Sequence, residues 1–130
     1  MILGIGTDII EVQRIQASHE RFGERFLNRI LHPNEISYCL SYKAPAPFLA
    51  ARFAAKEAIS KAFGTGIGAK LNWLDMEICR KDSGQPCVVL HERGAELFSS
   101  LQATAISGSA ISTTSVYLSG DSLQATAQRG

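Results

Sequence analysis

The stretch from Phe48 to Phe63 (FLAARFAAKEAISKAF) most constrains the fold, because it contains neither glycine nor proline and is rich in alanine. This composition strongly favours helix, and Gly64 directly after it is a typical helix stop. Apolar residues lie almost all the way round the helix, so we expect most of it to be buried. A chain of 130 residues has room for one core, and we expect one domain, residues 1–130, around this helix.

Glu57 and Lys61 are the polar residues that need an explanation on this helix. They are four positions apart and therefore neighbours at the edge of its alanine-rich face. Uncompensated buried charge costs several kcal/mol, so the two side chains must pair or hold a ligand. Spacing alone leaves both readings open. The following Gly64-Thr65-Gly66-Ile67-Gly68 turn has backbone N–H groups that could cradle a phosphate, although this pattern alone is weak evidence.

Residues 2–9 (ILGIGTDI) alternate with period two, which predicts a strand with Gly4, Gly6 and Asp8 on one face. Glycines in a strand allow another element or a ligand to come close. Asp8 is therefore in a site-like position. The segment lacks the basic flank and cleavage site of a signal peptide.

The other segments complete a mixed pattern of helix and strand. We expect helix over 11–31 with Gly23 as a potential interruption, a break at Pro33, a loop over 43–47, a β-hairpin over 74–90, helix over about 94–102 and strand in the final stretch.

Composition excludes several classes of function. The net charge is +1, which gives no general field for nucleic acid or a membrane surface, and no apolar run approaches the roughly 20 residues of a membrane helix. The three cysteines, Cys39, Cys79 and Cys87, are odd in number and scattered, which argues against a disulfide framework and a zinc site. We expect a cytoplasmic protein that binds neither nucleic acid nor membrane.

Two longer motifs carry a family resemblance. GIGTDIIEVQRI and RFAAKEAISKAFGTGIG strongly resemble the two signature motifs of the holo-acyl-carrier-protein synthases, the short bacterial type of 4'-phosphopantetheinyl transferase, and LDMEICRKDSGQP resembles the family's third stretch. The resemblance covers roughly Met1 to Leu90. It implies a compact α+β fold, with a small antiparallel sheet packed against a long central helix, and a homotrimer whose active sites are shared between subunits.

The resemblance also implies Mg²⁺-dependent transfer of phosphopantetheine from coenzyme A to a serine of apo acyl carrier protein, with release of 3',5'-adenosine bisphosphate. Asp8 and Glu57 would ligate Mg²⁺, which takes six oxygen ligands and usually one or two protein carboxylates. Lys61 would contact phosphate, and Glu57 is the candidate base, although sequence does not separate a base from a ligand. The implied coenzyme A contacts are Lys43, Arg52, Lys61, Gly64, Gly66, Gly84 and Pro86.

Some of these residues also have an alternative, purely structural interpretation. Arg52 would form a helix salt bridge, Lys56 would be a solvated or phosphate-facing charge, and the Gly84-Gln85-Pro86 segment would be ordinary turn chemistry.

An arginine stripe marks the first predicted helix. Its members are spaced by seven, four and four positions and would lie within about 80° of arc on a continuous helix. Such a stripe of charge is usually only the solvent-exposed side of an amphipathic helix. The resemblance implies instead a docking surface for an acidic carrier protein, formed by Arg14, Arg21, Arg25 and Arg29, with Phe26 as an apolar contact.

The C-terminal part departs from the family, because the expected histidine is missing. One alignment puts Thr113 in its place and matches Tyr117 to a family tyrosine. The other, which we prefer, sets residues 118–121 at the motif and begins the last strand at Ala125. His19, His32 and His91 lie elsewhere and are expected as surface or packing residues.

Two other functions fit parts of the pattern. Asp8, Glu57 and Lys61 alone would serve a Mg²⁺-dependent nucleotide pyrophosphohydrolase, and the altered C-terminal part would suit a subunit that only binds coenzyme A or a carrier.

Overall fold

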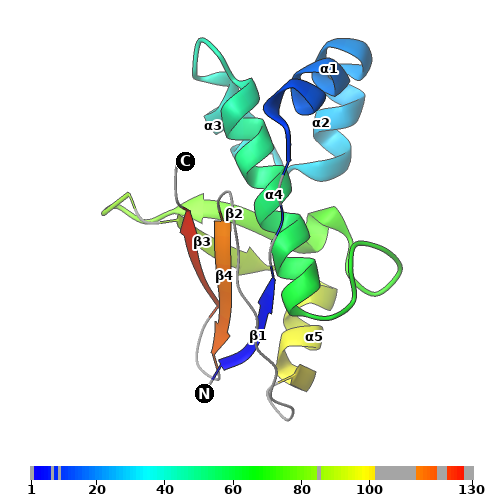
Figure 1. Ribbon diagram of the computed structural model, residues 1–130, viewed down its shortest axis with the longest axis vertical. Coiled ribbons are helices and arrows are strands. Elements are labelled where there is room, and N and C mark those ends of the chain that lie inside the picture. Colours follow the sequence, from blue (N-terminus) through cyan, green and yellow to red (C-terminus); the bar gives the residue numbers. More distant parts are fainter. Residues whose placement is uncertain are drawn as a thin grey trace.

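The computed structural model describes residues 2–6, 8, 10–84, 86–101, 114–119 and 123–127. Along the chain its elements are β1 (Ile2–Gly6), α1 (Val12–Phe22), α2 (Glu24–Ile30), α3 (Pro33–Leu40), α4 (Ala46–Ala62), the 3₁₀ helix η1 (Trp73–Asp75), β2 (Met76–Arg80), β3 (Pro86–Leu90), α5 (Glu92–Leu101), β4 (Thr114–Ser119) and β5 (Leu123–Ala127) (Figure 1).

Helix α4 is the central element. It packs against α1 near one end and against β1, β2 and β4 elsewhere, and Figure 1 shows α1 to α3 gathered around its first half. Leu49, Ala54, Ala58 and Ile59 are each at most 2% exposed. The helix ends where Gly64 adopts a φ of 78°, a conformation that glycine enters without steric cost. The predicted long, mostly buried helix is confirmed.

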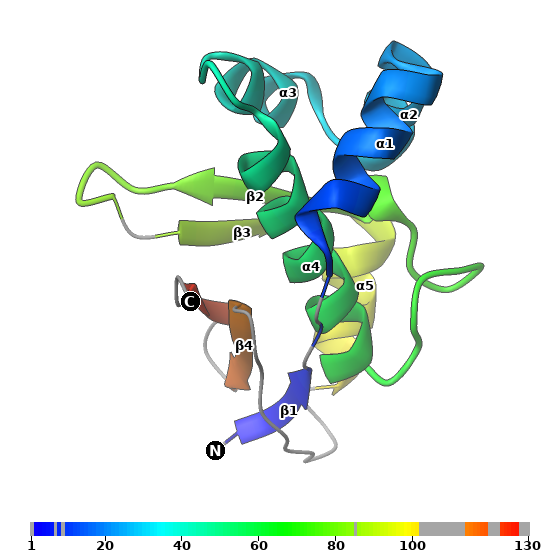
Figure 2. The same ribbon diagram turned by 45° about the horizontal axis from the view of Figure 1, so that its top comes forward.

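The strands form two antiparallel sheets. One has the order β1-β4-β5, and the other is the β2–β3 hairpin, which Figure 2 shows as a separate pair beside α4. The hairpin register runs from Met76 opposite Leu90 to Arg80 opposite Pro86. The α+β class and the hairpin are confirmed, but there are two sheets where one small sheet was expected.

The ends of the three-stranded sheet also differ from expectation. Strand β1 ends at Gly6, so Asp8 follows the strand and does not belong to its glycine-rich face. Strands β4 and β5 pair through Leu118 and Leu123, and β5 contains Ala125 to Ala127. Strand β5 therefore begins at Leu123, two residues before the start at Ala125 that the preferred C-terminal alignment predicts. Residues 111–113 and 120–122 of the two alignments lie outside the described residues.

Gly23 divides the first predicted helix in two. Its φ of 56° turns the chain, and its N–H donates to the carbonyl of His19 at 2.8 Å to close α1. Arg14 and Arg21 therefore lie on α1, whereas Arg25 and Arg29 lie on α2. The arc calculated for a continuous helix does not apply, although the four side chains are all exposed.

A buried ion pair connects α4 to α3. Lys56 is fully buried, and its Nζ donates to Glu35 Oε1 at 2.8 Å, to the Ile30 carbonyl at 2.7 Å and to the Trp73 carbonyl at 3.2 Å. Glu35 also accepts from the backbone N–H groups of His32 and Ile78. Burial lowers the pKa of Lys56, and Glu35 opposes this shift. The reading of Lys56 as a solvated or phosphate-facing charge is wrong.

Cys79 and Cys87 form a disulfide across the hairpin. The two residues are directly opposite in the register, and their Cα atoms are 5.0 Å apart, within the range that a disulfide spans. The argument against a disulfide was wrong, because an odd number of cysteines still permits one cross-strand pair. Cys39 is a free, buried cysteine. Among the described residues, no helix has the length and apolar character needed to cross a membrane.

Candidate active site

Asp8 and Lys61 meet where the chain leaves β1 and passes α4. Lys61 Nζ lies 3.0 Å from Asp8 Oδ1. The packing of β1 on α4 brings the two together although they are 53 positions apart. The Asp8 side chain is 16% exposed and that of Lys61 is 49% exposed, so the contact opens to solvent on the lysine side.

Glu57 lies one helical turn before Lys61 and shares the electrostatic environment of this contact. Its pKa is raised, first by burial and then by the negative charge of Asp8, while Lys61 opposes the shift. Asp8 and Glu57 are thus close enough to repel each other as carboxylates. A pair of repelling carboxylates beside solvent is a donor set that suits a divalent cation with oxygen ligands.

The charge on Glu57 should cost stability in the metal-free protein. Because the pKa of Glu57 is higher in the folded chain than the ordinary value of about 4.3, its stabilising contribution is present below that pH and is lost as the pH rises through the folded-state pKa. Glu57→Gln should therefore show a higher Tm than the wild type at about pH 8 and an equal Tm near pH 4. Thermal unfolding in a chelator measures this, with the exposed Glu96→Gln as control; parallel pH profiles for wild type and Glu57→Gln would contradict it.

The glycine-rich turn after α4 is engaged in backbone hydrogen bonds. The N–H groups of Thr65 and Gly66 both donate to the Ser60 carbonyl at 3.1 Å, that of Gly64 donates to Lys61, and that of Gly68 donates to Leu71. The amides of Gly64, Thr65 and Gly66 thus satisfy carbonyls at the end of α4, whereas that of Gly68 closes the turn that follows. The expectation that they cradle a phosphate does not hold for this conformation, in which their donors are already used.

Arg52 belongs to a second cluster, on the side of α4 that faces α3. Its guanidinium carbon lies 4.2 Å from the centre of the Tyr38 ring, and the guanidinium carbon of Arg80 lies 5.4 Å from the same centre. Arg80 Nη1 donates to the Gly84 carbonyl at 2.9 Å, which connects the hairpin turn to the cluster. Arg52 is 6% exposed, and its Nε has no hydrogen-bond partner in the structure. Tyr38 and Arg80 were missed from sequence: Tyr38 stands in no quoted motif, and Arg80 lies in the LDMEICRKDSGQP stretch, which does not indicate a contact with Arg52.

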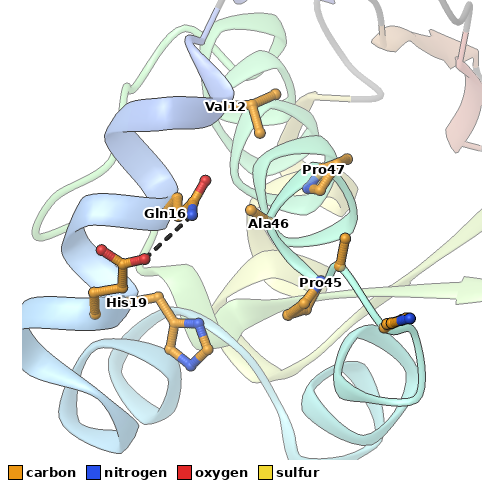
Figure 3. Close-up of a pocket in the computed structure, with 9 residues that line it drawn as sticks. Val12, Gln16, His19, Pro45, Ala46 and Pro47 are labelled. Carbon is orange, nitrogen blue, oxygen red and sulfur yellow. Dashed lines mark hydrogen bonds between the residues drawn. The ribbon is translucent and has the colours of Figure 1, made fainter.

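Lys43 lies elsewhere, in a groove of about 450 Å³ between α1 and the start of α4. Figure 3 shows Val12, Gln16 and His19 from α1 facing Pro45, Ala46 and Pro47 across it. The lining of this groove contains neither the Asp8 contact nor the Arg52 cluster, so within the described residues the groove does not unite Lys43 with the other predicted coenzyme A residues.

The arginine surface includes an aromatic residue that differs from the predicted one. Phe26 is half-buried and packs against the core beneath α1 and α2. Phe22 is 50% exposed, and the Arg21 guanidinium carbon lies 5.1 Å from its ring centre. The sequence signal for an exposed Phe22 was its position at the end of the helix, directly before Gly23.

Comparison with known proteins identifies the family. A profile of the 4'-phosphopantetheinyl transferase superfamily matches residues 4–115. The holo-[acyl-carrier-protein] synthase of Protochlamydia amoebophila is 52% identical over 100 residues, covering 77% of this chain and 82% of that protein. The chain belongs to the 4'-phosphopantetheinyl transferase superfamily.

Solved structures of related enzymes agree with this transferase in fold. The holo-[acyl-carrier-protein] synthase of Helicobacter pylori in complex with coenzyme A aligns with a TM-score of 0.64 and 36% identity, covering 78% of this chain and 80% of that one. The synthase of Neisseria meningitidis aligns with a TM-score of 0.74 and 31% identity, covering 99% and 100%. The resemblance seen in the two signature motifs is confirmed.

Proposed function

We propose that this transferase moves the 4'-phosphopantetheine group of coenzyme A to a serine hydroxyl of apo acyl carrier protein and releases 3',5'-adenosine bisphosphate. The observation that carries the proposal is the 3.0 Å contact between Asp8 and Lys61, within electrostatic range of Glu57, in a chain that is 52% identical to a holo-[acyl-carrier-protein] synthase. In the reaction, the serine oxygen forms a bond to the β-phosphorus, and the bond from that phosphorus to the bridging oxygen breaks.

The donor set of the site fits Mg²⁺. Asp8 and Glu57 would hold the ion, which would neutralise negative charge on the pyrophosphate oxygens of coenzyme A. Lys61 would place a compact positive charge on the same phosphates. Positioning and charge neutralisation supply most of the catalysis in phosphoryl transfer, so these parts suffice for the reaction.

Glu57 would also accept the serine proton. Efficient general bases have pKa values near the working pH, and both burial and Asp8 move the pKa of Glu57 in that direction. Glu57 would thus serve both the metal and the proton, whereas Asp8 would serve the metal alone.

The nucleotide half of coenzyme A would be held away from this point. The Arg52 cluster offers two guanidinium groups, one of which has a buried Nε that lacks a partner, beside the hairpin turn at Gly84 and Pro86. Guanidinium groups suit phosphate oxygens. Lys43 would contribute its charge from the separate groove between α1 and α4. Gly64 and Gly66 would contribute by the shape of their turn, since their N–H groups are engaged.

Intact mass spectrometry tests the function. The protein is incubated with apo acyl carrier protein, coenzyme A and Mg²⁺, and both carrier mass and nucleotide products are followed. A phosphopantetheine adduct with an equal amount of 3',5'-adenosine bisphosphate is the expected result. Cleavage of coenzyme A without an adduct would indicate a pyrophosphohydrolase, and binding without either product would indicate a binding subunit; each would overturn the proposal.

The arginine surface is proposed as the docking site for the carrier. Arg14→Glu/Arg25→Glu should raise the KM for carrier by roughly 10-fold or more, because like charges would face an acidic partner, and should leave the KM for coenzyme A unchanged. Steady-state kinetics with each substrate varied in turn measures both values. Lys70→Glu, an exposed reversal outside α1 and α2, is the matched control. Equal KM values for carrier in the double variant and the control would rule out this surface.

We also propose a homotrimer, as the family resemblance implies. Light scattering at micromolar concentration should give a mass about three times that of the 14.1 kDa chain. A monomer that is fully active at assay concentration would contradict shared active sites.

A further inference from the structure

Three potential metal ligands lie together outside the candidate active site. His32, Glu77 and His91 each offer a donor atom, and these atoms all lie within 4.8 Å of one another. His91 Nε2 is 2.9 Å from Glu77 Oε2. The rings of His32 and His91 lie with their centres 4.6 Å apart and a tilt of 30°. Both histidines were expected as surface or packing residues, because the 59 positions between them hide this contact in the sequence.

The backbone already fixes the three residues in place. His32 stands at the start of α3, where its N–H donates to Glu35 Oε1 at 2.9 Å. Glu77 is held opposite Val89 by the hairpin register. The N–H of His91 donates to the Asp75 carbonyl at 2.9 Å. The cluster therefore joins three separate segments that remain positioned without any ligand.

We propose that His32, Glu77 and His91 form a second metal site, for Zn²⁺ or a similar borderline transition-metal ion. Two imidazoles and one carboxylate suit such an ion, whereas Mg²⁺ prefers an all-oxygen set. Donor atoms around tetrahedral Zn²⁺ are about 3.4 Å apart. Side-chain rotations that move the donor atoms by roughly 1 Å would therefore bring them to this spacing. The His91 side chain is 38% exposed, which leaves solvent access for a water as fourth ligand.

The surroundings of His32 favour this role. Its Nε2 lies 2.8 Å from the Leu74 carbonyl. Since a carbonyl only accepts hydrogen bonds, Nε2 carries the ring proton. Nδ1 carries the lone pair, which accepts from the backbone N–H of Glu35 in the capping box of α3, and a metal ion would replace that bond. Metal-bound histidines usually have this arrangement, with the second ring N–H donated to a carbonyl or carboxylate that orients the ring.

A purely structural role is the competing explanation. Glu77 and His91 could act only as a hydrogen-bonded pair, with the ring of His32 packed on that of His91. The two explanations differ in one measurable respect, because a packed pair does not bind metal in a defined ratio. This proposal does not depend on the proposed function.

Metal titration of the untagged full-length chain tests the site, with Mg²⁺ present throughout. Co²⁺ is the spectroscopic probe and Zn²⁺ the competitor. We expect one Co²⁺ per chain, with the visible absorption of a four-coordinate ion, that one equivalent of Zn²⁺ displaces, and a Tm that rises with Zn²⁺ concentration. His91→Ala and His32→Asn should each weaken binding by at least about 10-fold, because even an outer partner of a metal ligand contributes that much. His19→Ala, on α1, is the matched histidine control and should bind like the wild type.

The proposal would be overturned by a lack of stoichiometric Co²⁺ binding in the wild type, or by equal affinity in His91→Ala and wild type. Using both His91→Ala and His32→Asn keeps the test valid if one variant fails to fold. Asp8→Asn separates this site from the candidate active site, because it should retain Co²⁺ binding. Loss of Co²⁺ binding in Asp8→Asn alone would place the ion at the active site and refute the second site, whatever the outcome of the transferase assay in Mg²⁺.

Discussion

Glu57→Gln should lower the rate of carrier modification by about 100-fold or more at saturating coenzyme A and carrier, because removal of a group that stabilises developing charge typically costs that much. Glutamine keeps the size of the side chain but loses the charge that binds Mg²⁺ and accepts the serine proton. The effect should appear in kcat, and raised Mg²⁺ should restore little of it, since the missing base is not replaced by metal.

The measurement is the initial rate of adduct formation by intact mass at several Mg²⁺ concentrations. Glu96→Gln removes an exposed carboxylate on α5 and should keep the full rate. Asp8→Asn should also be impaired, but high Mg²⁺ should restore part of its activity, because Asp8 is proposed to bind the ion only. Full activity of Glu57→Gln would remove Glu57 from the mechanism, and full rescue by Mg²⁺ would leave it as a ligand without a role as base.

Lys56→Met should lower the free energy of unfolding by about 3–5 kcal/mol, because it leaves the carboxylate of Glu35 buried without its partner. Lys56 and Glu35 are both fully buried at the side chain, and the lysine also satisfies two backbone carbonyls. The loss should come mainly from the uncompensated charge of Glu35. The double variant Lys56→Met/Glu35→Leu should therefore lose less than Lys56→Met alone.

Urea unfolding followed by circular dichroism gives these values. Lys70→Met replaces an exposed lysine with the same side chain and should stay within about 0.5 kcal/mol of the wild type. If the double variant were as unstable as Lys56→Met, the main contribution would come from backbone groups left without partners, and not from the buried charge. These groups are the carbonyls of Ile30 and Trp73 and the N–H groups of His32 and Ile78.

Features with a local cause were predictable from the sequence. The composition of residues 48–63 and the stop at Gly64 were enough for α4, and alternation around a turn was enough for the β2–β3 hairpin. The two motifs were enough for the family. These predictions depend on residues that are neighbours along the chain, where propensity and periodicity act directly.

Features that depend on distant partners were not predictable. A helical wheel does not show that Lys56 has Glu35 as a partner 21 positions earlier. The count of cysteines did not reveal that the hairpin register places Cys79 opposite Cys87, and no motif linked His32 to His91. Asp8 was assigned to the site for a reason that the structure does not support, since it follows β1 and meets Lys61 only through the packing of that strand on α4.

The buried pair determines which part of the active site is free to move. Lys56 directly precedes Glu57 and connects α4 to α2, α3 and η1 through its hydrogen bonds. Displacement of α4 would therefore disrupt interactions worth several kcal/mol. The contact between Lys61 and Asp8 is partly exposed, and contacts of that kind contribute only about 0–1 kcal/mol. Separation of Asp8 from Lys61 would therefore cost less than displacement of α4 when a bulky substrate enters.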